Sequence, residues 1–239
     1  MHTLKRTLLV TGASSGIGRA IAKQLLQQGH TIIGTSRDCS QFKVSHENFH
    51  FIEIDYTQLN QLKPKLKDLE KTYPALDGVI FSAGYGQFGS LEQFSFSQIE
   101  TMMTVNFTSP AFITRALLPG LKRKAHSNLI YIGSEAALQG SRKGSIYCAS
   151  KFALRGFTQA LRDECGTSSV RVSLINPGMV KTDFFDSLSF QPGDDETHGL
   201  LPEDIAETVN YILNSNPNSV IDEINLNPVN KVIKFKKQS

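Results

Sequence analysis

Short apolar segments alternate along this chain with longer segments whose apolar residues recur every three or four positions. The short segments, at residues 4–10, 31–35, 49–54, 78–82, 128–132, 170–175 and 220–226, predict strands. The longer ones, at residues 17–29, 58–73, 99–118, 147–165 and 202–213, predict helices. Strands that are apolar throughout are typical of a parallel sheet buried under helices on both faces. The alternation therefore predicts a doubly wound α/β fold.

Composition and charge favour one globular domain. No repeat, linker or low-complexity segment divides the 239 residues, of which 40% are hydrophobic and 20% charged. We expect one domain over residues 1–230 and a basic tail at 231–239, outside every functional element. The tail holds four lysines and no acid, so the formal charge of +3 falls to −1 for the rest of the chain. A body that is not basic argues against a nucleic-acid partner.

The cysteines and the N-terminus bear on the compartment. Cys39, Cys148 and Cys165 are odd in number and widely spaced, which suits a reducing environment better than a disulfide scaffold. The N-terminus lacks the apolar run of a secretory signal, and no segment approaches the ~20 apolar residues of a membrane-spanning helix. We expect a cytoplasmic protein with no membrane partner.

A glycine-rich turn, TGASSGIG at residues 11–18, lies between the first predicted strand and the first predicted helix. Glycines at such a turn let backbone N–H groups approach a pyrophosphate at the helix N-terminus. The spacing is GxxxGxG rather than GxGxxG, so a plain loop of small residues stays open as the alternative at this point.

The end of the second predicted strand bears on which dinucleotide would bind. An acid at this position would accept hydrogen bonds from the ribose hydroxyls of NAD, whereas an arginine suits the 2′-phosphate of NADP. The chain has Arg37 there and Asp38 one residue later. We expect NADP rather than NAD, with a solvated arginine as the alternative interpretation of Arg37.

Tyr147 and Lys151 are four residues apart and therefore share one face of a predicted helix. A free tyrosine, with a pKa of about 10, is a poor acid–base group near neutrality, and a fixed cation beside it favours the phenolate. We expect Lys151 to lower the pKa of Tyr147. Ser134 follows the fifth predicted strand, at the sheet edge where α/β proteins bind ligands. A lone Tyr-x-x-x-Lys pair is usually a surface pair, but here it joins the glycine turn and Ser134.

Taken together these motifs resemble the short-chain dehydrogenase/reductase family over essentially the whole chain. The resemblance rests on residues 11–18, Asp55, Ala83-Gly84, Asn106, Ser134, residues 147–151 and the NPGMVKT sequence at residues 176–182. It implies a Rossmann-like fold and an enzyme that transfers hydride between a nicotinamide cofactor and a carbonyl or secondary alcohol.

The resemblance also implies a role for each matching residue. Tyr147 would be the general acid or base, Lys151 would assist it and bind the nicotinamide ribose, Ser134 would polarise the carbonyl, and Asn106 would position a water. The residues expected to bind the cofactor are Gly12, Ser14, Ser15, Gly16, Ile17, Gly18, Arg37, Asp55, Ala83, Gly84, Tyr147, Lys151, Pro177, Gly178, Val180 and Thr182. One departure is Phe81-Ser82, where the family usually has two asparagines, which puts a structural hydrogen bond in doubt.

Two other motifs point elsewhere and are weaker. Residues 46–50 read HENFH, the HExxH pattern of zinc proteases, but they run into a predicted strand, where residues four apart are separated by roughly 13 Å. We expect no metal site. Cys148 has no histidine near it in the sequence, so we expect a packed thiol rather than a nucleophile.

Residues 183–201 follow the expected nicotinamide contacts and predict a mobile lid over the substrate. The segment holds Phe184, Phe185, Leu188 and Phe190, followed by a polar turn at residues 192–196. We expect a small to medium, partly apolar carbonyl or alcohol. The alternatives are a reductase of 3-oxoacyl groups on acyl carrier protein and a non-catalytic NADP-binding regulator. The resemblance also implies a homodimer or homotetramer, formed through the helices at 99–118 and 147–165.

Overall fold

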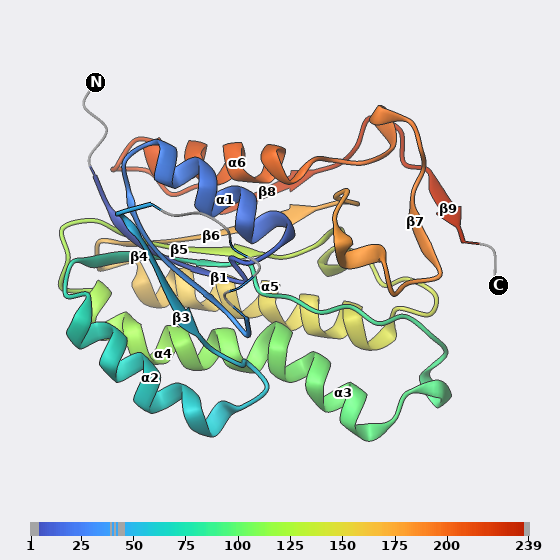
Figure 1. Cartoon of the computed structure of the whole chain (residues 1–239), viewed down its shortest axis with the longest axis horizontal. Coiled ribbons are helices and arrows are strands. Elements are labelled where there is room, and N and C mark those ends of the chain that lie inside the picture. The colour runs from blue at the N-terminus through green and yellow to red at the C-terminus, as the bar shows by residue number, and fades with distance from the viewer. Residues whose placement is uncertain (1–4, 39, 41, 43–45, 237–239) are drawn as a thin grey trace.

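A computed structural model of the chain describes residues 5–38, 40, 42 and 46–236 (Figure 1). Its core is a sheet of seven parallel strands in the order β3-β2-β1-β4-β5-β6-β8. The strands are β1 (Thr7–Thr11), β2 (Thr31–Ser36), β3 (Phe49–Glu53), β4 (Leu76–Phe81), β5 (Ser127–Ile132), β6 (Val170–Pro177) and β8 (Glu223–Leu226). The order reverses between β1 and β4, and a ligand crevice forms beyond the carboxyl ends of the strands at such a point.

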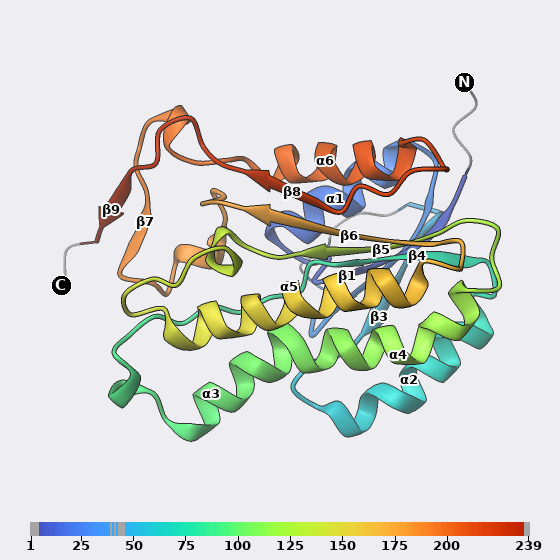
Figure 2. The same cartoon turned by 180° about the vertical axis from the view of Figure 1, so that it is seen from behind.

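Helices cover both faces of the sheet, as Figures 1 and 2 show. One face carries α1 (Gly16–Gln27) and α6 (Pro202–Asn214), whose apolar sides pack on the sheet through residues such as Ile21 and Val209. The other carries α2 (Leu59–Thr72), α4 (Ser109–Leu121) and α5 (Ser145–Cys165). The predicted doubly wound, Rossmann-like single domain is confirmed: helices cover both faces of a parallel sheet whose inner strands are buried on both sides, while the edge strands β3 and β8 are only partly buried.

The helix predicted at residues 99–118 differs from the observed one. The structure places α3 (Phe96–Met103) and α4 end to end, joined by a π-helical segment at Thr104–Thr108. The wider π turn explains why the apolar positions do not follow one stripe, since it rotates the helix face by inserting a residue. Asn106 lies in this segment and is 1% exposed.

The segment after residue 183 holds two short strands that the apolar pattern did not predict. Strand β7 (Phe190–Pro192) pairs antiparallel with β9 (Ile233–Phe235), and this ribbon lies apart from the main sheet (Figure 2). Residues 231–236 therefore contact the predicted lid, in contrast to the expectation that the tail is outside every functional element. The rest of the tail, residues 237–239, lies outside the described residues.

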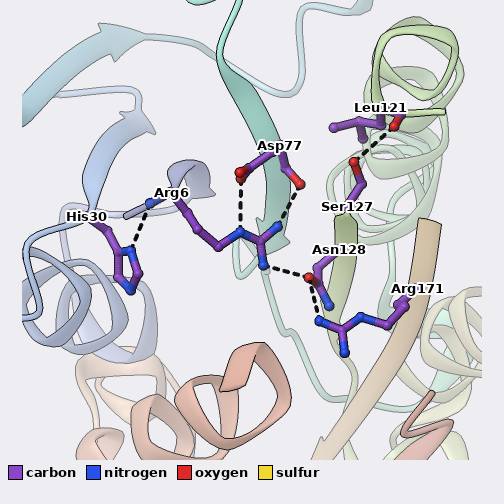
Figure 3. A network of polar contacts seen from close by, with 7 residues as sticks. All are labelled: Arg6, His30, Asp77, Leu121, Ser127, Asn128 and Arg171. Atoms are coloured by element: carbon purple, nitrogen blue, oxygen red, sulfur yellow. Dashed lines mark hydrogen bonds and ion pairs between the residues drawn. The ribbon is translucent and has the colours of Figure 1, made fainter. Parts of the chain in front are cut away.

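A polar network joins the amino ends of four strands, opposite the carboxyl-end crevice (Figure 3). The Arg6 guanidinium donates to Asp77 Oδ1 at 3.1 Å and to Asn128 Oδ1 at 2.7 Å, and Arg171 donates to the same Asn128 oxygen at 3.3 Å. The Arg6 backbone N–H donates to His30 Nδ1 at 3.1 Å. These contacts satisfy a buried arginine between β1, β4, β5 and β6.

Among the helices of the described residues, none is both long and apolar enough to cross a membrane.

Candidate active site

The carboxyl ends of the central strands bring together Ser134, Tyr147 and Lys151. Ser134 follows β5 and Gly133, and its hydroxyl accepts a hydrogen bond from the Ala136 backbone N–H at 3.1 Å. Tyr147 lies in the first turn of α5 and Lys151 one turn further along. All three side chains are buried, with exposed fractions of 9%, 8% and 5%. A hydroxyl, a phenol and an ammonium group are therefore largely shielded from solvent at the same end of the sheet.

Burial dominates the acidity of Tyr147. It raises the pKa of the phenol to about 12, while a hydrogen bond with the Ser134 side chain lowers it in part. Burial also lowers the pKa of Lys151 to about 8. The expected lowering of the Tyr147 pKa by Lys151 is wrong for this structure, because burial has the largest effect on the phenol and Lys151 is not among the groups that lower its pKa; the ammonium lies 5.8 Å from the phenol ring centroid. The phenol keeps its proton over the physiological range.

Two further contacts hold this group in place. Lys151 Nζ donates to the Ile132 carbonyl oxygen at the end of β5, at 3.2 Å. Asn106 Oδ1 accepts a hydrogen bond from the Tyr85 backbone N–H at 2.9 Å. Asn106 Nδ2 donates to the Tyr85 carbonyl oxygen at 2.8 Å and to Ser150 Oγ at 3.0 Å. Asn106 thus ties the loop after β4 to α5, the helix that carries Tyr147 and Lys151.

The glycine turn joins β1 to α1. Gly12 has a φ of +69°, and a Cβ there would lie 2.9 Å from Ala83 Cα, so only glycine fits between the two strand ends. The first turn of α1 holds no acid, and among the described residues the N-cap Ser15 side chain accepts no capping hydrogen bond. The backbone N–H groups of this turn and the positive end of the helix dipole fit the pyrophosphate of a dinucleotide.

Close approaches connect this turn to the other expected cofactor residues. A Cβ at Gly16 would lie 3.3 Å from Thr182 Cγ2, and one at Gly84 would lie 3.8 Å from Lys151 Nζ. Gly178 donates its N–H to the Leu226 carbonyl at 2.7 Å, and Val180 is buried beside Leu200. The glycine turn, the end of β4 and the 177–182 segment thus lie close together at the carboxyl ends of the strands, with Lys151 next to Gly84.

Arg37 and Asp55 are less closely assembled. The turn is tied to the end of β2, where the Thr35 carbonyl accepts from the N–H groups of Gly12 and Ala13 at 2.7 and 3.1 Å. Arg37 is exposed two residues further on. The Asp38 carboxylate accepts from the Ser40 N–H and hydroxyl, which lowers its pKa. Asp55 accepts from the Thr57 N–H and hydroxyl at the end of β3.

An aromatic cluster covers Tyr147. The rings of Phe88 and Phe184 lie 5.1 and 6.1 Å from the Tyr147 ring, and Phe190 lies 5.0 Å from Phe88. Two of these belong to the predicted lid, whereas Phe88, in the loop after β4, was not singled out from the sequence. Its only sequence signal is an aromatic residue shortly after a strand end. Together the rings explain why the phenol is desolvated.

The segment 176–182 and the neighbouring strands carry a second positioning contact. Asn176 Oδ1 accepts from the Ser134 N–H at 3.3 Å, and its Nδ2 donates to Glu223 at 2.8 Å. Glu223 in turn forms an ion pair with Arg155 on α5 at 3.1 Å. This chain of contacts links the Ser134 loop, the edge strand and the helix that carries Tyr147.

Comparison with known proteins gives the family. The sequence profile of the short chain dehydrogenase family matches residues 6–192. The chain belongs to the short-chain dehydrogenases. An uncharacterised oxidoreductase of Staphylococcus aureus strain USA300 is 30% identical to this dehydrogenase over 229 residues, covering 94% of this chain and 97% of the relative. The protein is therefore an oxidoreductase of this family.

Solved structures share the whole fold. Serine dehydrogenase from Escherichia coli superimposes with a TM-score of 0.80 at 27% identity, over 92% of this chain and 96% of that one. An alcohol dehydrogenase from the archaeon Thermococcus sibiricus, solved with 5-hydroxy-NADP, gives a TM-score of 0.85 at 26% identity, over 94% and 97% of the two chains.

Three sequence expectations outside the catalytic group can now be placed in the dehydrogenase. The Ser82 hydroxyl is buried, and among the described residues it has no hydrogen-bond partner, so the missing asparagine pair does leave a polar group unsatisfied. Glu47 lies in a turn and His50 in β3, so the HExxH residues do not share a helical face. Cys148 is buried, with its sulfur 3.5 Å from Ser141 Oγ, as a packed thiol should be.

Proposed function

We propose that this dehydrogenase is NADP-dependent and transfers hydride between the nicotinamide and a small to medium, partly apolar carbonyl or secondary alcohol. The observation that carries the proposal is the buried Tyr147 phenol, which lies beside the Ser134 side chain and has Lys151 Nζ 5.8 Å from its ring centroid, at the strand ends that also hold the glycine turn. In reduction the bound cofactor supplies a hydride to the carbonyl carbon.

Tyr147 gives its proton to the carbonyl oxygen, so that one hydride and one proton together convert the carbonyl to an alcohol. A phenol whose pKa burial raises to about 12 holds that proton until the oxygen becomes negative, which suits a general acid. Ser134 donates its hydroxyl proton in a hydrogen bond to the same oxygen. Lys151, whose pKa burial lowers to about 8, is positioned to return a proton to Tyr147.

The aromatic cluster supports the substrate class. Phe88, Phe184 and Phe190 surround Tyr147 with apolar surface, and Met179, Phe185 and Leu188 pack behind them. A substrate bound against these rings must carry an apolar group beside its carbonyl, because a charged one would lose its hydration without a partner.

The proposal also includes a homodimer or homotetramer. Phe96, Phe112 and Phe152 are exposed on α3, α4 and α5, the helices expected to form the interface. Light scattering of the purified protein measures its molar mass in solution, which distinguishes a monomer from a dimer or a tetramer.

Substitution of Tyr147 tests the mechanism. Tyr147→Phe removes the acid and should lower kcat roughly 10²- to 10⁴-fold for any carbonyl that the wild type reduces, followed by NADPH oxidation. NADPH binding, measured by its fluorescence, should stay within about threefold. Tyr211→Phe is the matched control, because Tyr211 is 64% exposed on α6 and should keep full activity. A Tyr147→Phe enzyme with wild-type turnover would refute the proposed role.

A further inference from the structure

The last described residues run along the outside of the lid. Define the lid as residues 183–201 and the strap as residues 229–236. Strand β9 of the strap pairs with β7 of the lid in the register Phe190–Phe235, Gln191–Lys234 and Pro192–Ile233. Beyond both ends of this ladder, Lys236 N–H donates to the Ser189 carbonyl at 2.8 Å and Asn230 N–H donates to the Thr197 carbonyl at 3.1 Å.

The strap's lysines each find an oxygen. Lys236 Nζ donates to the carbonyls of Phe185 and Asp186 at 2.6 and 3.0 Å. Lys234 pairs with Asp194 of the lid, and Lys231 pairs with Glu135, each at 2.6 Å. The Lys234–Asp194 pair is exposed on both sides and contributes little. Lys236 is half-buried and binds main-chain carbonyls that end the helical turn at Asp183–Phe185, where a cation also suits the dipole.

The residues held by the strap are those that cover Tyr147. Phe185 contacts Phe184 and Phe190, with ring centroids 5.3 and 5.9 Å apart, and Phe184 lies against Tyr147. Glu135, the partner of Lys231, directly follows Ser134. The strap therefore bridges the lid and the loop that carries the catalytic serine.

We propose that the strap holds the lid closed over Tyr147, and that Lys236 is a positioning residue for substrate binding. The predicted effect on KM rests on the proposed function, whereas the attachment of the lid by the strap rests on the contacts alone. Only a closed lid presents the Phe184 surface to a substrate. Apparent affinity falls by the fraction of molecules whose lid is open, so weakening the strap raises KM and leaves the chemistry at Tyr147 unchanged.

Lys236→Met in the full-length protein tests the structural part. Methionine keeps the aliphatic stem and removes both hydrogen bonds, so amide hydrogen exchange of lid peptides should accelerate by about tenfold or more. Lys236→Arg restores a charged donor and should bring exchange back to within about threefold of the wild type. Lys63→Met, an exposed lysine on α2, is the matched control and should leave the lid unchanged.

Steady-state kinetics test the positioning role in the same variants. Lys236→Met should raise KM for the carbonyl about five- to tenfold, with kcat and the Kd for NADPH within about twofold of the wild type. Unchanged lid exchange would overturn the strap, and faster exchange with an unchanged KM would overturn Lys236 as a positioning residue. A wild type that reduces no carbonyl overturns the proposed function alone, because the exchange measurement needs no turnover.

Discussion

At the scale of single residues, the chemistry of this dehydrogenase depends on burial as much as on residue type. Tyr147 and Lys151 were identified from their spacing, but the direction in which the pKa of Tyr147 shifts was predicted wrongly. The sequence places a cation one helical turn from a phenol, which favours the phenolate. The folded chain adds Phe88 and Phe184 around that phenol, and the loss of water raises the pKa to about 12. An acid that keeps its proton is the result.

Lys151 should make stability depend on pH. Its pKa is lowered from 10.5 to about 8 in the folded protein, so between these values the unfolded chain binds the extra proton and stability rises with pH. Below pH 8 the buried charge costs about 3 kcal/mol by this difference. Lys151→Met removes this titrating group. From pH 7.5 to 10.5 the free energy of unfolding of the wild type should therefore rise by about 3 kcal/mol relative to that of the variant.

Urea unfolding of both proteins at matched concentration measures this difference. Lys63→Met, which removes an exposed lysine, is the control and should show no such trend. A wild-type-to-variant difference that is flat across this pH range would contradict a lowered Lys151 pKa.

At the scale of elements, the proposed cofactor site is held together by short contacts that dock one strand end on another. The turn before α1 is held to β2 by the Thr35 carbonyl and to β4 by the fit of Gly12 against Ala83. The Thr11 hydroxyl adds to this by accepting from the N–H groups of Ser82 and Ala83, each at 3.0 Å. Arg37, directly after β2, is therefore close to the turn that would bind the pyrophosphate, while Asp38 is engaged by Ser40.

This arrangement predicts the cofactor preference. Arg37→Ala should weaken NADPH binding roughly 10- to 100-fold, because it removes charge-assisted hydrogen bonds to the 2′-phosphate, and should change NADH binding less than about twofold. Titration of each nucleotide by its fluorescence measures both constants. Arg115→Ala on α4, an exposed arginine, is the control. Equal affinities of the wild type for the two nucleotides would rule out the NADP preference.

Across the whole molecule, the two ends of the parallel sheet serve different purposes. The carboxyl ends hold Ser134, Tyr147 and Lys151, and the amino ends hold the Arg6 network of Figure 3. Arg6 is 7% exposed, and burial raises the pKa of its partner Asp77 in spite of the nearby cation. The network satisfies the Arg6 guanidinium, whereas Asn128 Nδ2 and His30 Nε2 have no hydrogen-bond partner among the described residues. None of its hydrogen bonds involves Ser134, Tyr147 or Lys151.

Arg6→Met should therefore lower stability without changing catalysis. It leaves the partly buried Asp77 carboxylate without its donor, at a cost of about 3 kcal/mol, while Asn128 Oδ1 keeps its hydrogen bond from Arg171. The value of kcat/KM at 25 °C should stay within about twofold. Adding Asp77→Leu should recover part of the loss, since it removes the stranded carboxylate. Thermal or urea unfolding and NADPH oxidation measure the two effects; a catalytic loss that exceeds the unfolded fraction would contradict this separation.

The sequence by itself determined the layered fold, the glycine turn and the order of the residues proposed to be catalytic. These follow from local patterns: apolar periodicity predicts strands and helices, and Tyr147 and Lys151 share a face because four residues span one turn. Element boundaries within residues 96–121 were less accurate, because the π turn interrupts the helical periodicity without marking where one helix ends and the next begins.

Tertiary structure alone decided what the basic tail does and how buried the site is. Residues 190–192 and 233–235 pair across some 40 positions, and three-residue strands have no pattern to detect. Lys236 looks like any exposed lysine in the sequence until its ammonium reaches the carbonyls of the lid. Pairing between distant segments, and the desolvation that follows from it, depends on the folded geometry, so no local property of the sequence determines it.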